Sequence, residues 1–381
     1  MRIIILFFLL SFGLSAHSQF ERRSSDTSIY ILTCSPGNDL YSVFGHTAIL
    51  VKTPTSDWVY NYGTFDFNQD NFYVKFARGQ LPYKLAKEQY GYFQYSYIME
   101  QRQILAQELD LTRSQKTKLI GLLEENVLPE NALYKYDFFL DNCATRVRDM
   151  IDSATDNEVE WGTNSSGNGY TFREMIQIYL GNMQWSDFGI DIALGLPCDV
   201  YLAEGQQAFL PDSLKHLFAH AQLNGKPLVM AEREALPAES YPQSTSFTDS
   251  TFKVITLISA VFFALILLFR NHMIGRFLSA LVLVINGLVG LLIVFLWFFT
   301  DHDATANNLN ILWANPFHLI LPFIKRTKQL WLKIYTVSAL ILLAAWVFIP
   351  QDLHESLLPF IVLSILSAVV YGRLLPSKTV N

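Results

Sequence analysis

The sequence has few charged residues and few cysteines for its length. Charged residues make up 16% of the 381 residues, whereas a soluble globular chain carries about 25%. Apolar residues make up 51%, and the mean hydropathy is +0.23. The chain is therefore too apolar to be a simple cytosolic protein, and its length indicates about two or three folding units.

Basic residues are also scarce. The chain has 28 Lys and Arg against 34 Asp and Glu, a net charge of −6, which excludes the basic surface of a nucleic-acid binder. Its three cysteines form no CxxC pair and no His/Cys cluster with zinc spacing. Phosphate-cradling GxGxxG and GxxxxGK motifs are also lacking. We therefore expect no nucleic-acid partner and no cofactor.

The first 18 residues have the pattern of a secretory signal peptide. Met1-Arg2 precedes an apolar run from Ile3 to Leu14, and Ala16-His17-Ser18 places small residues at −3 and −1 of a cleavage site before Gln19. The apolar run is too short to span a bilayer. A retained N-terminal anchor is the alternative, and under both interpretations the following domain is exported.

The apolar excess lies mainly in five segments near the C-terminus, which predict an all-α bundle of about five transmembrane helices within residues 251–375. Three or four of the segments are long enough to span ~30 Å as helices. The third is short and contains Pro316 and Pro322. The segments are Phe252–Phe269, Phe277–Phe299, Ile311–Ile324, Trp331–Ile349 and Leu357–Tyr371.

Charges between these segments predict the topology. Alternate connections carry the basic residues, namely Arg270, Arg276, Lys325, Arg326, Lys328, Arg373 and Lys378. The other two carry Asp301, Asp303, Asp352 and Glu355, with no Lys or Arg. The positive-inside rule then places the tail, residues 376–381, in the cytoplasm and residues 19–230 outside, multi-pass in a bacterial inner membrane. Residues 231–250, rich in Pro, Ser, Glu and Thr, are expected to be a tether.

The exported part is predicted to be α+β. Strand-like runs cover Ser28–Cys34, Gly45–Lys52 and Trp58–Gly63. Leu111–Val127 has helical periodicity, with a capping box formed by Thr112 and Gln115. The aromatic run Tyr90–Tyr97 is typical of a strand core, and Tyr134–Leu140 of a short strand or turn. A further helix begins near Cys143, capped by Asp141 or Asn142.

Cys143 is the strongest candidate nucleophile. A thiol in the first turn of a helix is stabilised as thiolate, and Arg146 adds positive charge one turn later. Cys34 follows a strand and Cys198 lies in a turn, so both lack this setting, and a disulfide between them has no support from spacing.

A cysteine nucleophile needs a base, and His46 is the best candidate. It enters a strand through Gly45, whereas His216 and His220 lie in what resembles a surface helix. A third polar group usually orients the imidazole. Asn61 on the next strand is our choice, with Tyr60, Tyr62 and Asp66 as rivals, because a one-residue change of register exchanges the faces of a strand.

Four motifs of the exported part and one of the membrane part resemble the Lnb-type apolipoprotein N-acyltransferases of diderm bacteria. The exported motifs are Leu32–Gly37, Phe44–Ala48, Tyr60–Phe67 and Asp141–Arg146, and the membrane motif is Asn308–Asn310 with Leu312–Pro316. The order of a histidine strand, a polar strand and an Asn-Cys helix start also resembles the circularly permuted NlpC/P60, papain-like group that includes lecithin:retinol acyltransferase-like enzymes.

The resemblance implies transfer of a fatty acyl chain from a glycerophospholipid to Cys143 as a thioester. The acceptor would be the α-amino group of a diacylglyceryl-modified lipoprotein cysteine. Cys143, His46 and Asn61 are the expected catalytic residues, with the oxyanion held by the Cys143 N–H and a donor near Tyr41 and Ser42. The expected substrate-binding residues are Arg146, Tyr41, Ser42 and Tyr62.

Two alternatives keep the same domain. An NlpC/P60-like cysteine peptidase or amidase of the envelope would use the same dyad, and an inactive papain-like domain would make the chain a membrane receptor or assembly factor. Asn315 and His318 are polar groups at membrane depth, which either help to admit lipid or belong to a re-entrant segment that satisfies its own proline-broken backbone.

Overall fold

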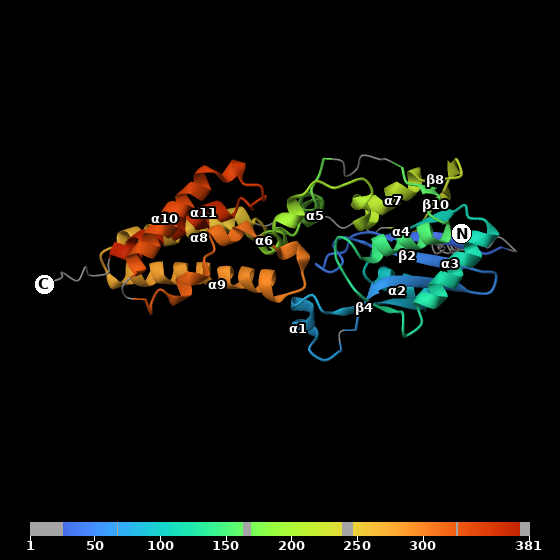
Figure 1. Cartoon of the computed structure of the whole chain (residues 1–381), viewed down its shortest axis with the longest axis horizontal. Coiled ribbons are helices and arrows are strands. Elements are labelled where there is room, and N and C mark those ends of the chain that lie inside the picture. Colours follow the sequence, from blue (N-terminus) through green and yellow to red (C-terminus); the bar gives the residue numbers. More distant parts are fainter. Residues whose placement is uncertain (1–25, 67, 163–168, 238–246, 325–326, 374–381) are drawn as a thin grey trace, which may run out of the picture.

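The computed structural model describes residues 26–66, 68–162, 169–237, 247–324 and 327–373. Figure 1 shows an elongated molecule with a sheet-rich domain at one end and a helical region at the other. The predicted signal peptide (residues 1–18) and tail (residues 376–381) lie outside the described residues.

The N-terminal domain is built on an antiparallel sheet with the order β10-β5-β1-β2-β3-β4-β6. Its strands are β1 Ser28–Cys34, β2 His46–Lys52, β3 Asp57–Thr64, β4 Pro82–Gln89, β5 Ile104–Leu109, β6 Leu133–Lys135 and β10 Val229–Leu236. A second small sheet contains β7 Val159–Glu160, β8 Gln222–Leu223 and β9 Lys226–Pro227. The three strands expected from the sequence thus form the consecutive neighbours β1, β2 and β3.

Helices cover both faces of the large sheet. The helices of this domain are α1 Phe72–Ala77, α2 Tyr90–Met99, α3 Arg113–Asn126, α4 Cys143–Ala154, α5 Phe172–Leu180, α6 Gln184–Ala193 and α7 Pro211–His220. Of these, α2 packs on one face of the sheet and α3, α4 and α7 pack on the other. Alternation along the strands separates two cores. Ile31 and Ile49 pack with α3, α4 and α7, whereas Leu32 and Leu50 pack with α2. The capping box of Thr112 and Gln115 at the start of α3 is confirmed.

Two local expectations were wrong. Tyr90–Tyr97 is helical, because Tyr90, Phe93 and Tyr97 recur at helical spacing and bury one face of α2 against the sheet. Residues 229–236 form the edge strand β10, paired with β5, so the sheet extends into the predicted tether. The charged residues of this strand obscure the alternation of apolar and polar residues that predicts a strand, although charged residues are typical of sheet edges.

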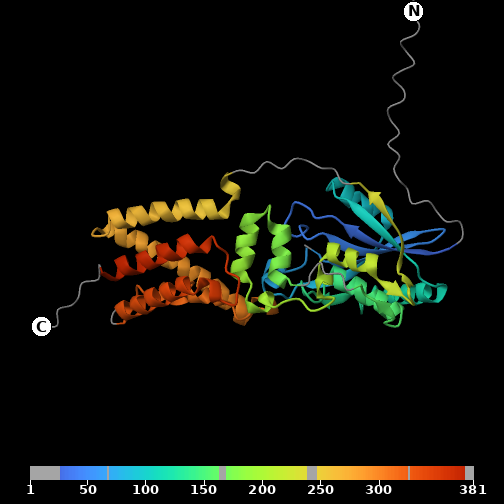
Figure 2. The ribbon, with the colours of Figure 1, turned by 90° about the horizontal axis from the view of Figure 1, so that it is seen from above.

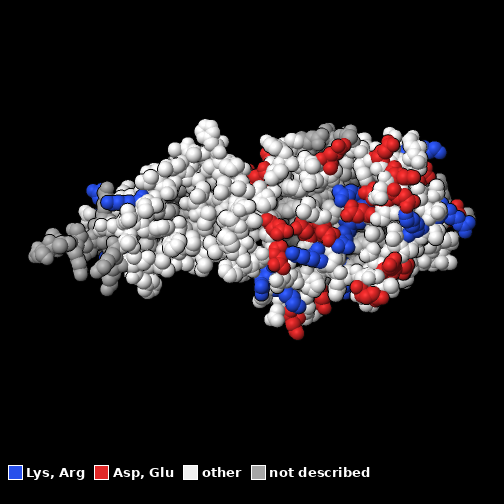
Figure 3. Space-filling view, in the orientation of Figure 1, with Lys and Arg blue, Asp and Glu red and all other residues white. Residues whose placement is uncertain are grey.

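The C-terminal region contains four α-helices among its described residues. They are α8 Thr251–Leu268, α9 Met273–Phe299, α10 Lys328–Ala344 and α11 Leu357–Arg373. By length and composition, α8 and α9 are apolar enough to cross a membrane, and α11 is a shorter apolar helix. Figure 3 shows that charged side chains gather on the N-terminal domain, while the helical region is almost free of them except at its far end.

The third predicted helix, Ile311–Ile324, does not form. This segment contains two 3₁₀ turns, Leu309–Leu312 and Pro316–Ile320, because proline lacks the backbone donor that an α-helix needs. It nevertheless runs along α9 to the far end, where Lys328 begins α10. The five-helix bundle is therefore corrected to four α-helices and one irregular segment within the described residues.

Asn286 of α9 satisfies the backbone of this irregular segment. Its Nδ2 donates to the carbonyl of Trp313 (2.7 Å), and its Oδ1 accepts from the backbone N of Asn315 (2.9 Å) and lies 2.9 Å from His318 Nδ1. Non-helical backbone at membrane depth is tolerated where protein buries it. The segment is thus supported by a neighbouring helix, which differs from the second sequence interpretation, a segment that satisfies its own broken backbone.

The helical region is joined to the N-terminal domain through α6. Amide side chains of Asn308, Asn310 and Gln351 donate to backbone carbonyls at the end of α6, at Ile192 (2.8 Å), Asp191 (3.2 Å) and Leu194 (3.0 Å), respectively. Figure 2 shows α5 and α6 standing between the sheet and the long helices. These buried bonds fix the domain against the end of the helical region.

Candidate active site

The start of α4 presents Cys143 beside the large sheet. Asn142 is the N-cap, and its Oδ1 accepts from the backbone N of Ala144 (2.8 Å) and of Thr145 (3.0 Å). Its Nδ2 donates to the carbonyls of Phe138 and Phe209, both at 2.7 Å. The helix therefore begins with Cys143, which is 7% exposed.

His46 begins β2 directly across the ladder from Cys34. The preceding Gly45 has a φ of 78°, and a Cβ there would lie 2.8 Å from the Cys34 carbonyl oxygen. A side chain at position 45 would be strained by both features. The tight entry turn thus fixes where the imidazole leaves the strand.

Asn61 of β3 holds the imidazole from the other side. His46 Nε2 lies 2.6 Å from Asn61 Oδ1, and Asn61 Nδ2 donates to Glu88 Oε1 of β4 (3.2 Å). The Glu88 oxygen accepts a hydrogen bond from the Asn61 amide nitrogen, which fixes the orientation of the Asn61 amide. Asn61 Oδ1 therefore faces the imidazole, and His46 Nε2 is the donor. The other ring nitrogen, Nδ1, is then the one available to the Cys143 thiol, with which His46 also hydrogen-bonds.

The three thiols of the chain have different electrostatic surroundings. All three are buried and free. Burial raises the pKa of Cys34 and of Cys198 to about 12. Burial also opposes ionisation of Cys143, but the charge and hydrogen bond of His46, with backbone N–H groups of Thr47 and Ala144, outweigh it and lower the Cys143 pKa. Cys143 is therefore the thiol that ionises most readily of the three.

The histidine shows the matching shift. Burial disfavours imidazolium, but the neighbouring Cys143 and the hydrogen bonds to Cys143 and Asn61 outweigh that effect and raise the His46 pKa. The lowered thiol pKa and the raised imidazole pKa have the same cause, because each group favours the charged form of the other.

The predicted substrate-binding residues lie in different settings. Arg146 pairs with Asp141 through Nε (2.5 Å) and Nη2 (2.7 Å), and its guanidinium stacks 3.7 Å from the Tyr134 ring centre and 5.9 Å from that of Tyr62. The Tyr62 hydroxyl is buried without a hydrogen-bond partner among the described residues. Arg146 is thus already neutralised by a carboxylate.

Tyr41 and Ser42 belong to the turn before β2. Tyr41 is 66% exposed, whereas Ser42 is buried and its Oγ donates to the Asp39 carbonyl (3.0 Å). The backbone N–H groups that face the sulfur belong to Thr47 and Ala144.

Sequence reasoning missed the functions of Glu88 and Asn142. Glu88 lies on β4, and its relation to Asn61 depends on strand register. Asn142 was considered only as a cap, yet its Nδ2 also ties α4 to two distant carbonyls. An Asn, rather than a Ser or Asp, directly before the cysteine is the signal that a donor is needed as well as an acceptor.

Replacing Asn142 with aspartate is expected to destabilise the domain by about 3 kcal/mol. The carboxylate retains the capping oxygen, but it turns an acceptor toward the carbonyls of Phe138 and Phe209 at a position only 2% exposed. Thermal unfolding in detergent measures the effect. Asn131→Asp is the matched control, because its amide donates to the Glu125 carbonyl at an exposed position. Equal unfolding temperatures for the two variants would contradict the assignment.

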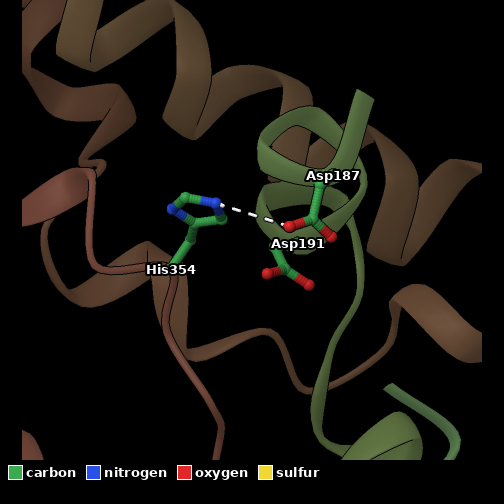
Figure 4. Close-up of side chains that lie close together, drawn as sticks. All are labelled: Asp187, Asp191 and His354. Atoms are coloured by element: carbon green, nitrogen blue, oxygen red, sulfur yellow. Dashed lines mark ion pairs between the residues drawn. The ribbon is translucent and has the colours of Figure 1, made fainter. Parts of the chain in front are cut away.

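One group among the described residues has metal-like geometry. Figure 4 shows Asp187 and Asp191 of α6 facing His354, which precedes α11. Both oxygens of Asp191 already accept, from Arg173 (2.9 Å) and Gln177 (3.0 Å), and His354 Nε2 lies 3.7 Å from Asp187 Oδ2. We assign this cluster to the junction between the two parts of the molecule.

Two protein-family models match the chain. The Lnb N-terminal periplasmic domain matches residues 18–177, and the Lnb transmembrane domain matches residues 243–378. No curated protein and no solved structure matches. The first match contains the candidate thiol, histidine and asparagine, and the second contains all four long C-terminal helices.

Proposed function

Because this chain belongs to the Lnb family, with a periplasmic domain followed by a membrane domain, we propose that it is a membrane-bound lipoprotein N-acyltransferase. Family membership makes it a lipoprotein-related membrane protein with a periplasmic N-terminal part. The acyl transfer, the nucleophile and both substrates are our proposal. The observation that carries it is the Cys143–His46–Asn61 arrangement, in which one of three buried thiols has a lowered pKa.

In the first half-reaction the Cys143 thiolate attacks an ester carbonyl carbon of a glycerophospholipid. The carbon–oxygen ester bond breaks, and the leaving alkoxide takes the proton from the His46 imidazolium. The products are an acyl thioester on Cys143, a lysophospholipid and a neutral imidazole. The backbone N–H groups of Thr47 and Ala144 lower the Cys143 pKa and so stabilise the attacking thiolate.

In the second half-reaction the α-amino group of a diacylglyceryl-cysteine attacks the thioester carbonyl. The carbon–sulfur bond breaks, His46 takes the amine proton, and the thiolate–imidazolium pair is restored. One histidine thus donates and then accepts a proton at the same atom. Asn61, at 2.6 Å, keeps the ring in a single orientation through both steps.

The membrane part supports lipid chemistry rather than hydrolysis of wall peptides. We propose that α8 to α11 and the irregular segment cross the inner membrane, with the far end in the cytoplasm. Arg270 lies in the turn between α8 and α9, and Arg276 and Lys328 lie at the starts of α9 and α10. Asp301 and Asp352 lie at the junction end. This distribution follows the positive-inside rule and supports the proposed topology.

The fold of the periplasmic domain supports a permuted papain-like interpretation. His46 on β2 and Asn61 on β3 precede Cys143 on α4 along the chain. A papain-like site needs the same three groups in space, whatever their order.

Mass spectrometry of a model lipoprotein tests the proposal. We expect the purified chain, in vesicles with an isotope-labelled phospholipid, to add one labelled acyl chain to the N-terminus of a diacylglyceryl-modified peptide. An acceptor with a blocked α-amino group is the control and should gain no mass. Free labelled fatty acid without acceptor acylation would favour a hydrolase, and unchanged lipid and peptide would favour a non-enzymatic receptor.

A further inference from the structure

A cavity of about 210 Å³ lies between the periplasmic domain and the segment that follows α9. Its walls on the domain side are mainly aromatic and aliphatic, and residues 301–305 close it from the membrane part. The apolar wall residues that the argument uses are Phe44, Tyr136, Phe138, Ile176, Ile190 and Leu194.

The cavity wall adjoins the candidate nucleophile. Tyr136 lines the cavity, and a Cβ built on Gly63 would lie 3.4 Å from the edge of its ring and 3.5 Å from Cys143 Cβ. Phe44 lies just before β2 and precedes His46 by two residues. Its ring packs against Phe138, with ring centres 4.8 Å apart. Cys143 therefore lies near one residue of the apolar wall, Tyr136. His46 lies two positions along the chain from another, Phe44.

Backbone hydrogen bonds hold the membrane-side wall in place. The backbone N of Asp301 donates to the Arg78 carbonyl (2.8 Å), and the backbone N of Gly195 donates to the Ala304 carbonyl (2.8 Å). The wall is therefore part of the junction between the two domains. A ligand in this cavity would lie where the periplasmic domain meets the outer end of α9.

We propose that this cavity holds the acyl chain while it is bound to Cys143 as a thioester. This inference rests on the proposed acyltransferase function and names the part of the substrate that the cavity takes. A fatty chain leaving the bilayer loses apolar surroundings, and an apolar cavity next to the thiol replaces them. The polar side chains of Asp301, His302 and Asp303 line the membrane-side wall. They suit the polar head group of a lipid rather than its acyl chain.

A second apolar cavity, of about 290 Å³, provides an internal comparison. It lies among α6, α8, α9 and α11, and its lining includes Ile192, Phe262 and Trp313. None of the catalytic candidates lines it. Ile190 and Ile192 are two residues apart on α6, yet the first lines the cavity that includes Tyr136 and the second lines this one.

Cavity filling tests the inference. Wild-type protein, Ile190→Trp and Ile192→Trp are placed in vesicles of phosphatidylethanolamine with either short or long acyl chains, and the Cys143 thioester is quantified by mass spectrometry. We expect Ile190→Trp to lower the ratio of long-chain to short-chain thioester by about tenfold, since loss of pocket volume discriminates by chain length. Ile192→Trp should keep the wild-type ratio.

Ile190→Ala keeps the test decisive if the tryptophan variant does not fold, as judged by its thermal unfolding. The larger cavity should raise the long-chain share of the thioester. An unchanged ratio in the folded Ile190 variants, or an equal change in Ile192→Trp, would overturn the inference. A wild-type protein that forms no thioester with either lipid would instead overturn the proposed function, so the two failures are distinguishable.

Discussion

Replacing Cys143 with serine is expected to reduce acyl transfer to a model lipoprotein by at least about 10³-fold. A serine hydroxyl is nearly isosteric, but it ionises far less readily than a thiol whose pKa His46 lowers. The position is buried at the first residue of α4, where serine is well tolerated, so the fold should persist. Mass spectrometry of the acceptor peptide, with thermal unfolding as the stability measurement, gives the result.

The other two cysteines supply the controls for this experiment. Cys34 and Cys198 are also buried, and their pKa values are raised to about 12 by that burial. Cys34→Ser and Cys198→Ser should therefore retain transfer, apart from losses explained by lower stability. Full activity in Cys143→Ser, or a labelled thioester on Cys34 or Cys198, would remove Cys143 from the nucleophile role.

Replacing His46 with alanine is expected to lower transfer by about 10²- to 10⁴-fold and to move the reactivity of Cys143 to higher pH. His46 supplies the charge and the hydrogen bond that lower the Cys143 pKa, while burial, which raises it, remains. The pKa of Cys143 should then rise above the ordinary value for a thiol, as for the other buried cysteines. In the wild type, thiolate forms below the ordinary thiol pKa and is lost as pH falls through the lowered value.

The rate of iodoacetamide alkylation at Cys143, followed by mass spectrometry from pH 5 to pH 10, measures this shift. The alkylation profile of wild-type protein should rise at a pH below the ordinary thiol pKa, whereas that of His46→Ala should rise at a pH above it. His216→Ala is the matched control, because His216 is an exposed histidine on α7 of the same domain. Identical pH profiles for wild type and His46→Ala would show that His46 does not set the state of the thiol.

Local patterns were enough to identify the main parts of this molecule. The two-part division, the strands β1 to β3, the capped helix α3 and the helix start at Cys143 all depend on neighbouring residues. Hydrophobic runs, alternation and capping are local properties, and they act before any long-range contact forms. Cys143 and His46 were singled out for the same reason, since one lies at a helix start and the other at a strand entry.

Contacts between distant segments decided the rest. Asn61 was preferred over Tyr60, Tyr62 and Asp66 without proof, because alternate strand residues point to opposite faces and the face depends on pairing. Its place 2.6 Å from His46 becomes visible only with β2 beside β3. Likewise, β10 depends on β5 for its hydrogen bonds, and Asn286 supports an irregular segment 29 residues further along the chain.

The sequence by itself predicted a highly apolar, exported chain of two parts, with one thiol at the start of a helix. Only the tertiary structure decided which of the three buried thiols has a lowered pKa, because the sign of the shift depends on whether an imidazole lies close enough to outweigh burial. It also decided where the apolar cavity lies, since its walls come from residues 44, 79, 136–139, 176, 190, 194 and 301–305. Those segments meet only when the periplasmic domain packs against the end of α9.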